Sequence, residues 1–255
     1  MNRVVSLSTA LLICISIAAS TASAADVTLM SPGAVSSSLR VLIPQFEQSS
    51  GHKVTVTYLP ALALADRLKK GETTDVAIVG EPAADELVKL GKFVAGSKVV
   101  IARVGVGVFV RRGDPKPDIS TPDAFLRSVM NAKNISYSDP KLGGTAANYV
   151  GQLLASLDVT GSITPKTKLT APSRPLADFV VNGGADFGLT QITEIMADPR
   201  LEFVGPLPEE IQFYTHYAAG VMAASSHQEA GKALIAFLAS PAASDVMKSK
   251  GFTQF

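Results

Sequence analysis

Residues 138–145, SDPKLGGT, decide the fold because they join an apolar strand pattern to a helical pattern through a pair of glycines. Two further segments have the same arrangement, residues 31–38 (SPGAVSSS) and residues 190–193 (TQIT). Each of the three follows an apolar run typical of a buried strand and precedes the spacing of a helix. This alternation predicts an α/β fold, in which ligands bind outside the carboxyl ends of the strands, where these junctions lie.

The three junctions are suited to hold a small anion. The first turn of a helix leaves backbone N–H groups unpaired, and the helix dipole is positive at that end. Glycine lets a ligand approach the backbone, and serine and threonine hydroxyls add donors without adding charge. A serine or threonine at a helix start is also an ordinary N-cap, so one junction alone would indicate only a cap. Three junctions, one of them with a glycine pair, favour a binding site.

Strand and helix patterns alternate along the rest of the chain. Leu39, Leu42, Ile43 and Phe46 recur at the spacing of one helix face, and Gly51 is placed to end that helix. Further helices are predicted at 62–70, 82–90, from 121, through 149–157, and at 175–181, 227–239 and 241–250. Strands are predicted at 27–30, 54–58, 75–79, 99–110, 135–138, 187–191, 201–204 and 217–223.

Two polar segments that contain proline are candidate crossings between lobes: residues 111–117 (RRGDPKP) and residues 205–208 (GPLP). They predict a first lobe of residues 25–110 plus 210–255 and an inserted second lobe of residues 111–209. Gly105 and Gly107 precede the first crossing and suit a twisted strand that passes between lobes. One larger domain is the alternative that periodicity leaves open.

Residues 1–24 have the pattern of a signal peptide. A short basic start precedes an apolar run, Val4–Ala18, and Ala-Ser-Ala at 22–24 provides the small residues of a cleavage site. The apolar run is short for a membrane span, and small polar residues follow it. We therefore expect export to the periplasm. Cys14, the only cysteine, lies in this segment, so the mature chain is expected to lack thiols and disulfides.

Composition argues against several classes of function. Lysine and arginine number 23 against 22 aspartates and glutamates, without a basic tract, so neither nucleic acid nor an anionic membrane is an expected partner. Tryptophan is absent and aromatic residues make up 6%, which disfavours a sugar-stacking surface. The three histidines are far apart in sequence, and no P-loop or complete dinucleotide motif occurs. We therefore expect no metal and no cofactor.

Six short segments carry a resemblance to a known family. They are MSPGA at 30–34, IPQFE at 43–47, GETTDV at 71–76, YSDP at 137–140, FGLTQ at 187–191 and FLASPAA at 237–243. In these segments, which are spread over nearly the whole mature chain, the protein resembles the periplasmic solute-binding proteins of ABC importers, and most closely the molybdate-binding group. The resemblance implies a two-lobe type II fold, each lobe a mixed sheet flanked by helices. It also implies a protein that closes around a small anionic ligand and delivers it to a permease in the inner membrane. We expect the protein to be a monomer.

The first function that we predict is therefore that of an exported protein that binds an anion between its two lobes. The expected ligand contacts are Ser31, Gly33, Ala34, Pro60, Ser138, Gly143, Gly144, Thr145, Thr190 and Gln191. The family's molybdate binders imply serine hydroxyls at the first two junctions, but Ala34 stands at one and the apolar stretch YLPALA, residues 58–63, at the other. Gln191 stands where the family implies a tyrosine. These departures favour a small organic acid, and a molybdate-like oxyanion stays open.

The alternative interpretation is an enzyme on the same scaffold, because the group that the chain resembles also includes aconitate isomerase-like members. Their reaction moves a proton along a propene tricarboxylate, which requires a base near the carbon and donors for the carboxylates. The candidate groups are Asp139, Glu194, Tyr137 and His216, with Arg174 as a carboxylate clamp. No spacing in the sequence requires this chemistry. We expect binding without catalysis and keep isomerisation of small polycarboxylates as the alternative.

Overall fold

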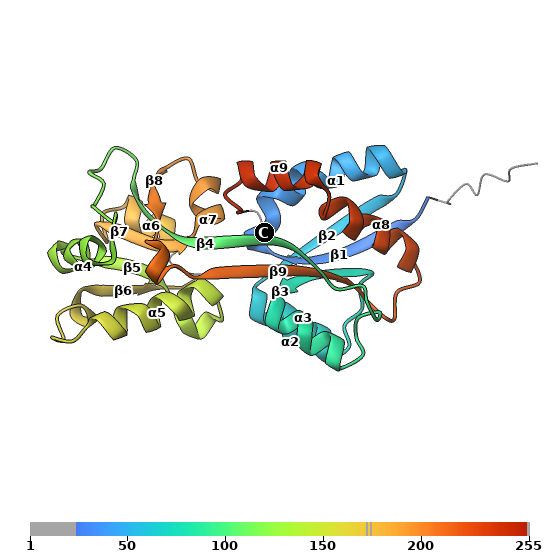
Figure 1. Ribbon diagram of the computed structural model, residues 1–255, viewed down its shortest axis with the longest axis horizontal. Helices are drawn as coiled ribbons and strands as arrows, with labels where there is room; N and C mark the ends of the chain where they lie inside the picture. Colours follow the sequence, from blue (N-terminus) through green and yellow to red (C-terminus); the bar gives the residue numbers. More distant parts are fainter. Residues whose placement is uncertain (1–23, 172, 174, 254–255) are drawn as a thin grey trace, which may run out of the picture.

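The computed structural model describes residues 24–171, 173 and 175–253. The molecule is elongated, and two groups of strands and helices lie at its two ends, joined by two long strands (Figure 1). The predicted signal peptide lies outside the described residues except for Ala24, and so does Arg174.

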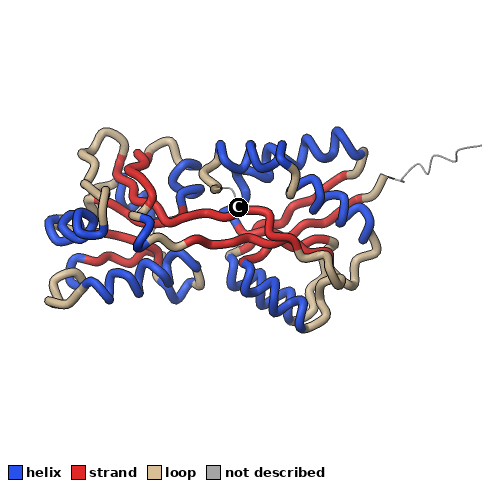
Figure 2. Tube along the Cα trace, viewed as in Figure 1, coloured by secondary structure: helices blue, strands red, loops and turns tan. Residues whose placement is uncertain are grey.

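The first group combines the beginning of the described chain with its end. Its strands are β1 (Asp26–Pro32), β2 (Lys53–Leu59), β3 (Val76–Gly80) and β9 (Tyr214–Val221). β1 is parallel to β2 and β3, whereas β9 is antiparallel to β3. The helices are α1 (Ser36–Ser50), α8 (Gln228–Leu238) and α9 (Pro241–Ser249) on one face, with α2 (Ala61–Lys69) and α3 (Glu81–Lys89) on the other (Figure 2).

The second group comes from the middle of the chain. Its strands are β5 (Ile135–Ser138), β6 (Thr167–Thr170), β7 (Phe187–Gln191) and β8 (Leu201–Pro206). β5 is parallel to both β6 and β7. Its helices are α4 (Pro122–Asn131) and α5 (Thr145–Leu157), which share one buried apolar cluster, and α6 (Leu176–Val181) and α7 (Ile192–Ala197), which share another. Mixed sheets covered by helices on both faces confirm the predicted α/β class.

Strand β4 (Val99–Arg111) belongs to both groups. Through residues 99–105 it pairs with β9, and through residues 106–111 it pairs with β7 and β8. Val104 packs in the apolar cluster of the first group, and Val106 packs in that of the second. The division into lobes at residues 110/111 and 209/210 remains a prediction; the packing itself changes within β4, at Gly105.

Gly107 allows helix α7 to lie close to β4. A Cβ atom at this position would lie 2.8 Å from Phe203 and 2.9 Å from Ile192, distances that packed side chains do not tolerate. The glycine therefore sets the depth at which α7, and the pocket wall that α7 carries, sits against the long strand.

Helix boundaries follow the local signals in the sequence. Gly51 ends α1 in the left-handed conformation, with φ of 76°. The Thr121 hydroxyl accepts from the Ala124 N–H at the start of α4, and the Ser240 hydroxyl accepts from the Ala243 N–H at the start of α9. Strand β6, with the sequence TKLT, was not predicted, and β9 begins at Tyr214 rather than at residue 217. Within the described part of the chain, no helix combines the length and apolar character needed to cross a membrane.

Candidate functional site

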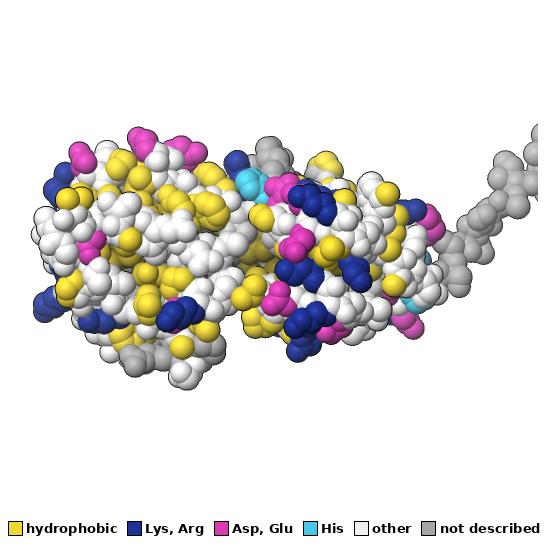
Figure 3. Space-filling model, turned by 90° about the horizontal axis from the view of Figure 1, so that it is seen from below, with side chains coloured by type: hydrophobic (Ala, Val, Ile, Leu, Met, Phe, Trp, Pro, Cys, Tyr) yellow, Lys and Arg dark blue, Asp and Glu magenta, His cyan; other side chains and the backbone are white. Residues whose placement is uncertain are grey.

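A cavity of about 500 Å³ lies between the two groups of elements. It is formed at the carboxyl ends of β1, β2, β5 and β7, where each strand gives way to a helix. A space-filling view from below shows a notch between the two halves of the molecule (Figure 3). The three predicted junctions therefore do meet around one cavity, although the first and the last are about 160 residues apart in the sequence.

Nine of the ten predicted ligand contacts line this cavity. They are Gly33, Ala34, Pro60, Ser138, Gly143, Gly144, Thr145, Thr190 and Gln191. Ser31 does not line it. Ser31 lies two residues after Leu29 and four after Val27, so strand alternation turns its side chain toward the same buried face, and its hydroxyl donates to the Pro32 carbonyl at 3.2 Å.

Four helical segments begin at the wall of the cavity: the 3-10 turn Gly33–Val35 that leads into α1, and helices α2, α5 and α7. None of these four has a hydrogen bond from a first-turn N–H to its N-cap side chain; the same holds for α3, α6 and α8, which begin away from the cavity, whereas α4 and α9 have one. At α5 the N-cap is Gly144, and the preceding Gly143 has a φ of 81°. The wall therefore presents backbone donors and positive dipole ends toward one cavity, which favours a negatively charged ligand.

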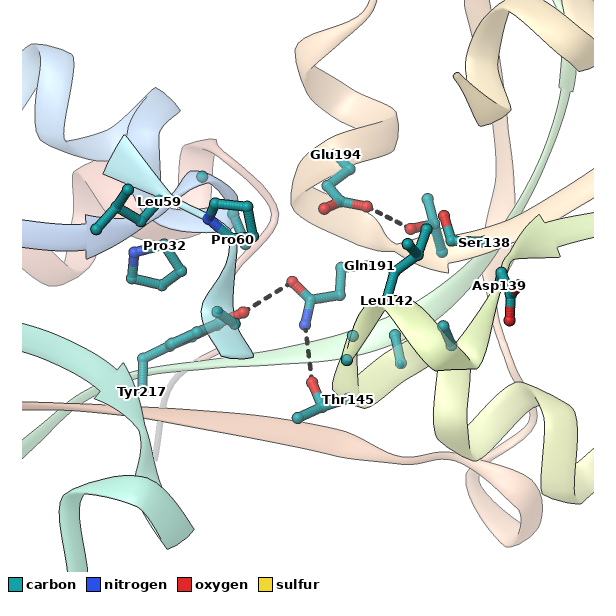
Figure 4. Close-up of a pocket in the computed structure, with 18 of the residues that line it drawn as sticks. Pro32, Leu59, Pro60, Ser138, Asp139, Leu142, Thr145, Gln191, Glu194 and Tyr217 are labelled. Carbon is teal, nitrogen blue, oxygen red and sulfur yellow. Dashed lines mark hydrogen bonds between the residues drawn. The ribbon is translucent and has the colours of Figure 1, made fainter. Parts of the chain in front are cut away.

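A buried polar network forms one side of the cavity (Figure 4). The Tyr217 hydroxyl donates to Gln191 Oε1 at 3.0 Å, and Gln191 Nε2 donates to Thr215 Oγ1 at 3.1 Å. The hydroxyls of Thr215 and Thr145 are 2.8 Å apart, and Thr145 lines the cavity. Burial strongly raises the pKa of Tyr217, so this hydroxyl remains protonated and available as a donor. The network ties β9 of the first group to β7 and α5 of the second.

Glu194, in the first turn of α7, lines the cavity together with Thr190 and Ser138 (Figure 4). The Thr190 hydroxyl donates to the Glu194 carboxylate. Although the side chain is accessible to water in the open cavity, the surrounding protein raises the pKa of Glu194, and the Thr190 hydrogen bond offsets this only in part. A carboxylate with a raised pKa in a ligand cavity is a candidate for proton transfer.

The opposite wall of the cavity is largely apolar. Pro32, Tyr58, Leu59 and Pro60 come from the first group of elements. At the mouth, Gly143 contacts Leu62 of α2: a Cβ on Gly143 would lie 2.6 Å from Leu62 Cβ. The cavity therefore offers an apolar face for a carbon skeleton and hydrogen-bond donors for its polar groups.

The other residues considered for catalysis have separate locations. Asp139 lines the cavity, and its carboxylate accepts the Lys141 N–H at 2.9 Å. Tyr137 is buried against α5 near Gly151 and is not among the cavity residues, and burial raises its pKa. His216 alternates with Thr215 and Tyr217 along β9, so it points to the opposite face of the strand. Arg174 lies outside the described residues.

Thr215 and Tyr217 belong to the polar network beside the cavity, and the sequence did not assign either of them to the site. The sequence predicts Tyr217 only as the first residue of the strand at 217–223, and it gives Thr215 no role. Their spacing of two along one strand places them on one face, and this was the available signal. In the described residues, no group of three or more histidine, cysteine, aspartate or glutamate side chains is arranged to hold a metal ion.

This fold and this cavity define a two-lobe solute-binding protein. Residues 27–253 match the family described as bacterial extracellular solute-binding protein, and the chain belongs to that family.

Two known proteins and one solved structure are similar to this chain over most of its length. The chain is 30% identical to a Pseudomonas sp. protein named aconitate isomerase, over 88% of this chain and 86% of that protein. It is 27% identical to the molybdate-binding protein ModA of Azotobacter vinelandii, over 91% of each chain. The solved structure of the Azotobacter vinelandii periplasmic molybdate-binding protein superposes with a TM-score of 0.72 at 16% identity, covering 90% of this chain and 99% of that one. The resemblance inferred from the sequence is thereby confirmed, and so is the fold.

Proposed function

We propose that this protein is an exported, periplasmic solute-binding protein that captures a small organic carboxylate for an ABC importer. The observation that carries this proposal is the convergence of four helix starts without side-chain caps on one cavity. Helix N-termini and hydroxyls can hold carboxylate oxygens without a counter-ion. We further propose that it acts as a monomer and passes its ligand to a permease in the inner membrane.

An organic acid fits the cavity better than a tetrahedral oxyanion does. The side chains of Pro32, Leu59 and Pro60 form an apolar patch on one wall, in which Tyr58 has the only side-chain donor among the described residues, and such a patch suits carbon atoms. A small dianion such as molybdate would meet no serine or threonine hydroxyl from the described residues on that side. Its oxygens there would depend on the backbone N–H groups at the starts of the Gly33–Val35 turn and α2 and on Tyr58, and any oxygen left without a donor is costly in a site that excludes water. Glu194 would also repel a permanently charged dianion.

Thermal denaturation with a panel of anions tests the proposal. The panel contains tricarballylate, trans-aconitate, molybdate and sulfate. A ligand at about 100 times its Kd stabilises a protein by about 2.7 kcal/mol, which raises the Tm by several degrees. We expect this shift with at least one of the two tricarboxylates and not with molybdate or sulfate. A strong shift with molybdate at micromolar concentration would contradict the proposed ligand class.

A matched pair of variants identifies the cavity as the place of binding. Thr145→Val removes a hydroxyl from the cavity wall, whereas Thr57→Val removes one from the exposed side of β2. We expect the first change to weaken binding at least tenfold, because a ligand oxygen loses a donor, and the second to leave the Kd unchanged. Equal effects of the two variants would place the ligand elsewhere.

Glu194 supports a second candidate function, isomerisation of a small polycarboxylate, and the similarity to an aconitate isomerase favours the same chemistry. In this reaction the Glu194 carboxylate would take a proton from the methylene carbon, the double bond would shift by one position, and the proton would return to the other end of the allylic system. The backbone and hydroxyl donors of α5 would hold the carboxylates.

Proton NMR in D₂O distinguishes the two functions. Turnover of cis- to trans-aconitate with deuterium at the reacting carbons, abolished by Glu194→Gln, would establish the enzyme. Tight binding of either isomer without interconversion would leave binding as the function and exclude isomerisation of this substrate.

A further inference from the structure

The cavity proposed to hold an anion contains a carboxylate and, among the residues that the structure describes, no lysine, arginine or histidine in its lining. Glu194 and Asp139 are the two acidic groups in that lining. Asp139 already accepts the Lys141 N–H and points away from Gln191 and Tyr217 (Figure 4). Glu194 is therefore the carboxylate that an anionic ligand meets.

The elements that pack against α7 bring no counter-ion to Glu194. The 3-10 turn Gly33–Val35 and β7 contribute no charged side chain. On β4, the Arg103 guanidinium lies 4.4 Å from the centroid of the Tyr214 ring and donates to Thr253 Oγ1 at 3.0 Å, and Arg111 pairs with Asp114.

The other charged or titratable groups near α7 are paired with another residue, lie away from Glu194, or are neutral. On β8, Glu202 pairs with Lys116 at 3.0 Å. The C-terminal turn at Gly251, next to Lys250, meets α7 at Ile192 and Met196 rather than at Glu194. Across the cavity, Tyr58 and Tyr217 stay neutral because burial raises the pKa of both hydroxyls.

Two like charges that approach in such a cavity raise the pKa of each other until one group takes up a proton. We propose that Glu194 and the bound ligand hold one proton between them, so that binding takes up a proton and the cavity selects carboxylic acids over anions that stay fully ionised, such as sulfate. This inference rests on the proposed binding function. Thr190 supports it as well, because its hydroxyl fixes one Glu194 oxygen and leaves the other to face the ligand.

Isothermal titration with tricarballylate measures the proton directly. Tricarballylate has no double bond, so it binds without being isomerised, and its carboxyls are fully ionised above about pH 7. Titrations in buffers with different ionisation enthalpies give the number of protons taken up as a slope. We expect this number to rise toward one between pH 5 and pH 9, and the affinity to fall about tenfold per pH unit once one proton is taken up.

Two variants give the control. Glu194→Gln keeps an oxygen to accept from Thr190 but cannot take up a proton, so its proton number should be zero and its Kd flat above pH 7. Asp139→Asn removes the other charge in the lining and keeps an acceptor for the Lys141 N–H, so its proton number should equal that of the wild type. Sulfate should not bind the wild type at concentrations at which tricarballylate saturates it.

Three outcomes overturn the inference. If the wild type binds tricarballylate without taking up a proton at any pH, the shared proton is ruled out and the proposed binding function still stands. This measurement needs no variant. If the number of protons taken up is unchanged in Glu194→Gln and falls to zero in Asp139→Asn, Asp139 and not Glu194 takes up the proton, and the inference is wrong. Absence of binding by every carboxylate would remove the proposed function, and this inference with it.

Discussion

Asp75 and Glu194 are carboxylates in opposite halves of the molecule, and their surroundings differ. Asp75 is buried, and burial alone would raise its pKa, but it accepts from the Ser225 hydroxyl at 2.6 Å and from the Thr28 N–H and hydroxyl, each at 2.8 Å. These donors outweigh burial and lower the pKa of Asp75. Glu194 has one hydroxyl donor, and its pKa is raised. A carboxylate supplied with protein donors holds the fold, and one left short of donors is available to a ligand.

The two walls of the cavity differ in the same way. The first half contributes an apolar surface that includes Pro32, Leu59 and Pro60, whereas the second contributes the hydroxyls and amide of Ser138, Thr145, Thr190 and Gln191 together with Glu194. On the proposed function, we expect the second half to supply the side-chain donors for the polar groups of the ligand, and the first half to supply backbone N–H groups and the apolar surface that covers its carbon atoms. The following changes test this division.

The largest effect is expected at Asp75. Asp75→Ala leaves the Thr28 N–H, the Thr28 hydroxyl and the Ser225 hydroxyl without their buried acceptor, which should lower the free energy of unfolding by about 2–4 kcal/mol. Urea denaturation at pH 7 measures the loss. The Kd for the ligand should not change, because Asp75 lies outside the cavity lining.

The Asp75 effect should also depend on pH. Since the pKa of Asp75 is lower in the folded state than its ordinary 3.8, its stabilisation is complete above that value and is lost as the pH falls through the folded pKa. The difference between wild type and Asp75→Asn should therefore shrink toward acid pH. A constant difference would contradict the assigned hydrogen bonds.

Gln191→Leu should have the next largest effect. The change leaves the Tyr217 hydroxyl and Thr215 without their shared amide partner, which should cost about 1–3 kcal/mol of unfolding free energy and also weaken ligand binding. Adding Tyr217→Phe should recover part of the loss, since the unpaired hydroxyl is then gone. Strict additivity of the two changes would show that the network does not act as a unit.

Gly143→Asn should have a smaller effect, from contact across the cavity mouth. Asparagine tolerates a positive φ, but its Cβ would meet Leu62, so a loss of about 1–2 kcal/mol and a weaker ligand affinity are expected. Gly161→Asn is the control, because Gly161 has a φ of 69° and no atom within 4 Å of the added Cβ. Equal losses in the two variants would mean that backbone strain, and not the contact with Leu62, sets the cost.

Glu194→Gln should change stability least, and in the opposite direction. Folding raises the pKa of the Glu194 carboxyl, so the free energy of unfolding falls as the pH rises above the pKa that this group has in the unfolded chain. Replacing the carboxyl by an amide should therefore stabilise the protein at pH 8 and have no effect near pH 4. Chemical denaturation at the two pH values checks the sign. Destabilisation at pH 8 would mean that the Glu194 charge supports the fold.

The sequence could predict the elements whose burial imposes a period. Leu39, Leu42 and Phe46 define a helix face, and Gly51 ends that helix because it adopts a positive φ. The junctions after β1, β5 and β7 were predictable because helix starts carry characteristic residues. Strand β6 was not, since TKLT has no apolar alternation and is a strand only through its pairing with β5.

The residues of each junction could be predicted from the sequence, but the way in which the two halves meet around the cavity could not. The misplacement of Ser31 was avoidable, because its alternation with Val27 and Leu29 already indicates the core face. Thr215 and Tyr217 were harder, since their meeting with Gln191 depends on how the two halves are set against each other. That setting follows from long-range packing, which periodicity does not encode.

Because β4 runs unbroken through both halves, the molecule cannot be divided into two independently expressed pieces at the predicted segment boundaries. A fragment of residues 111–209 would lack nearly all of the β4 residues that pair with β7 and β8. The edges of β7 and β8 would then be unpaired, which favours aggregation. Any split version of this protein, for example as a two-part biosensor, would have to be cut in a surface loop such as the one around Gly161, where the added ends would meet no packed neighbour.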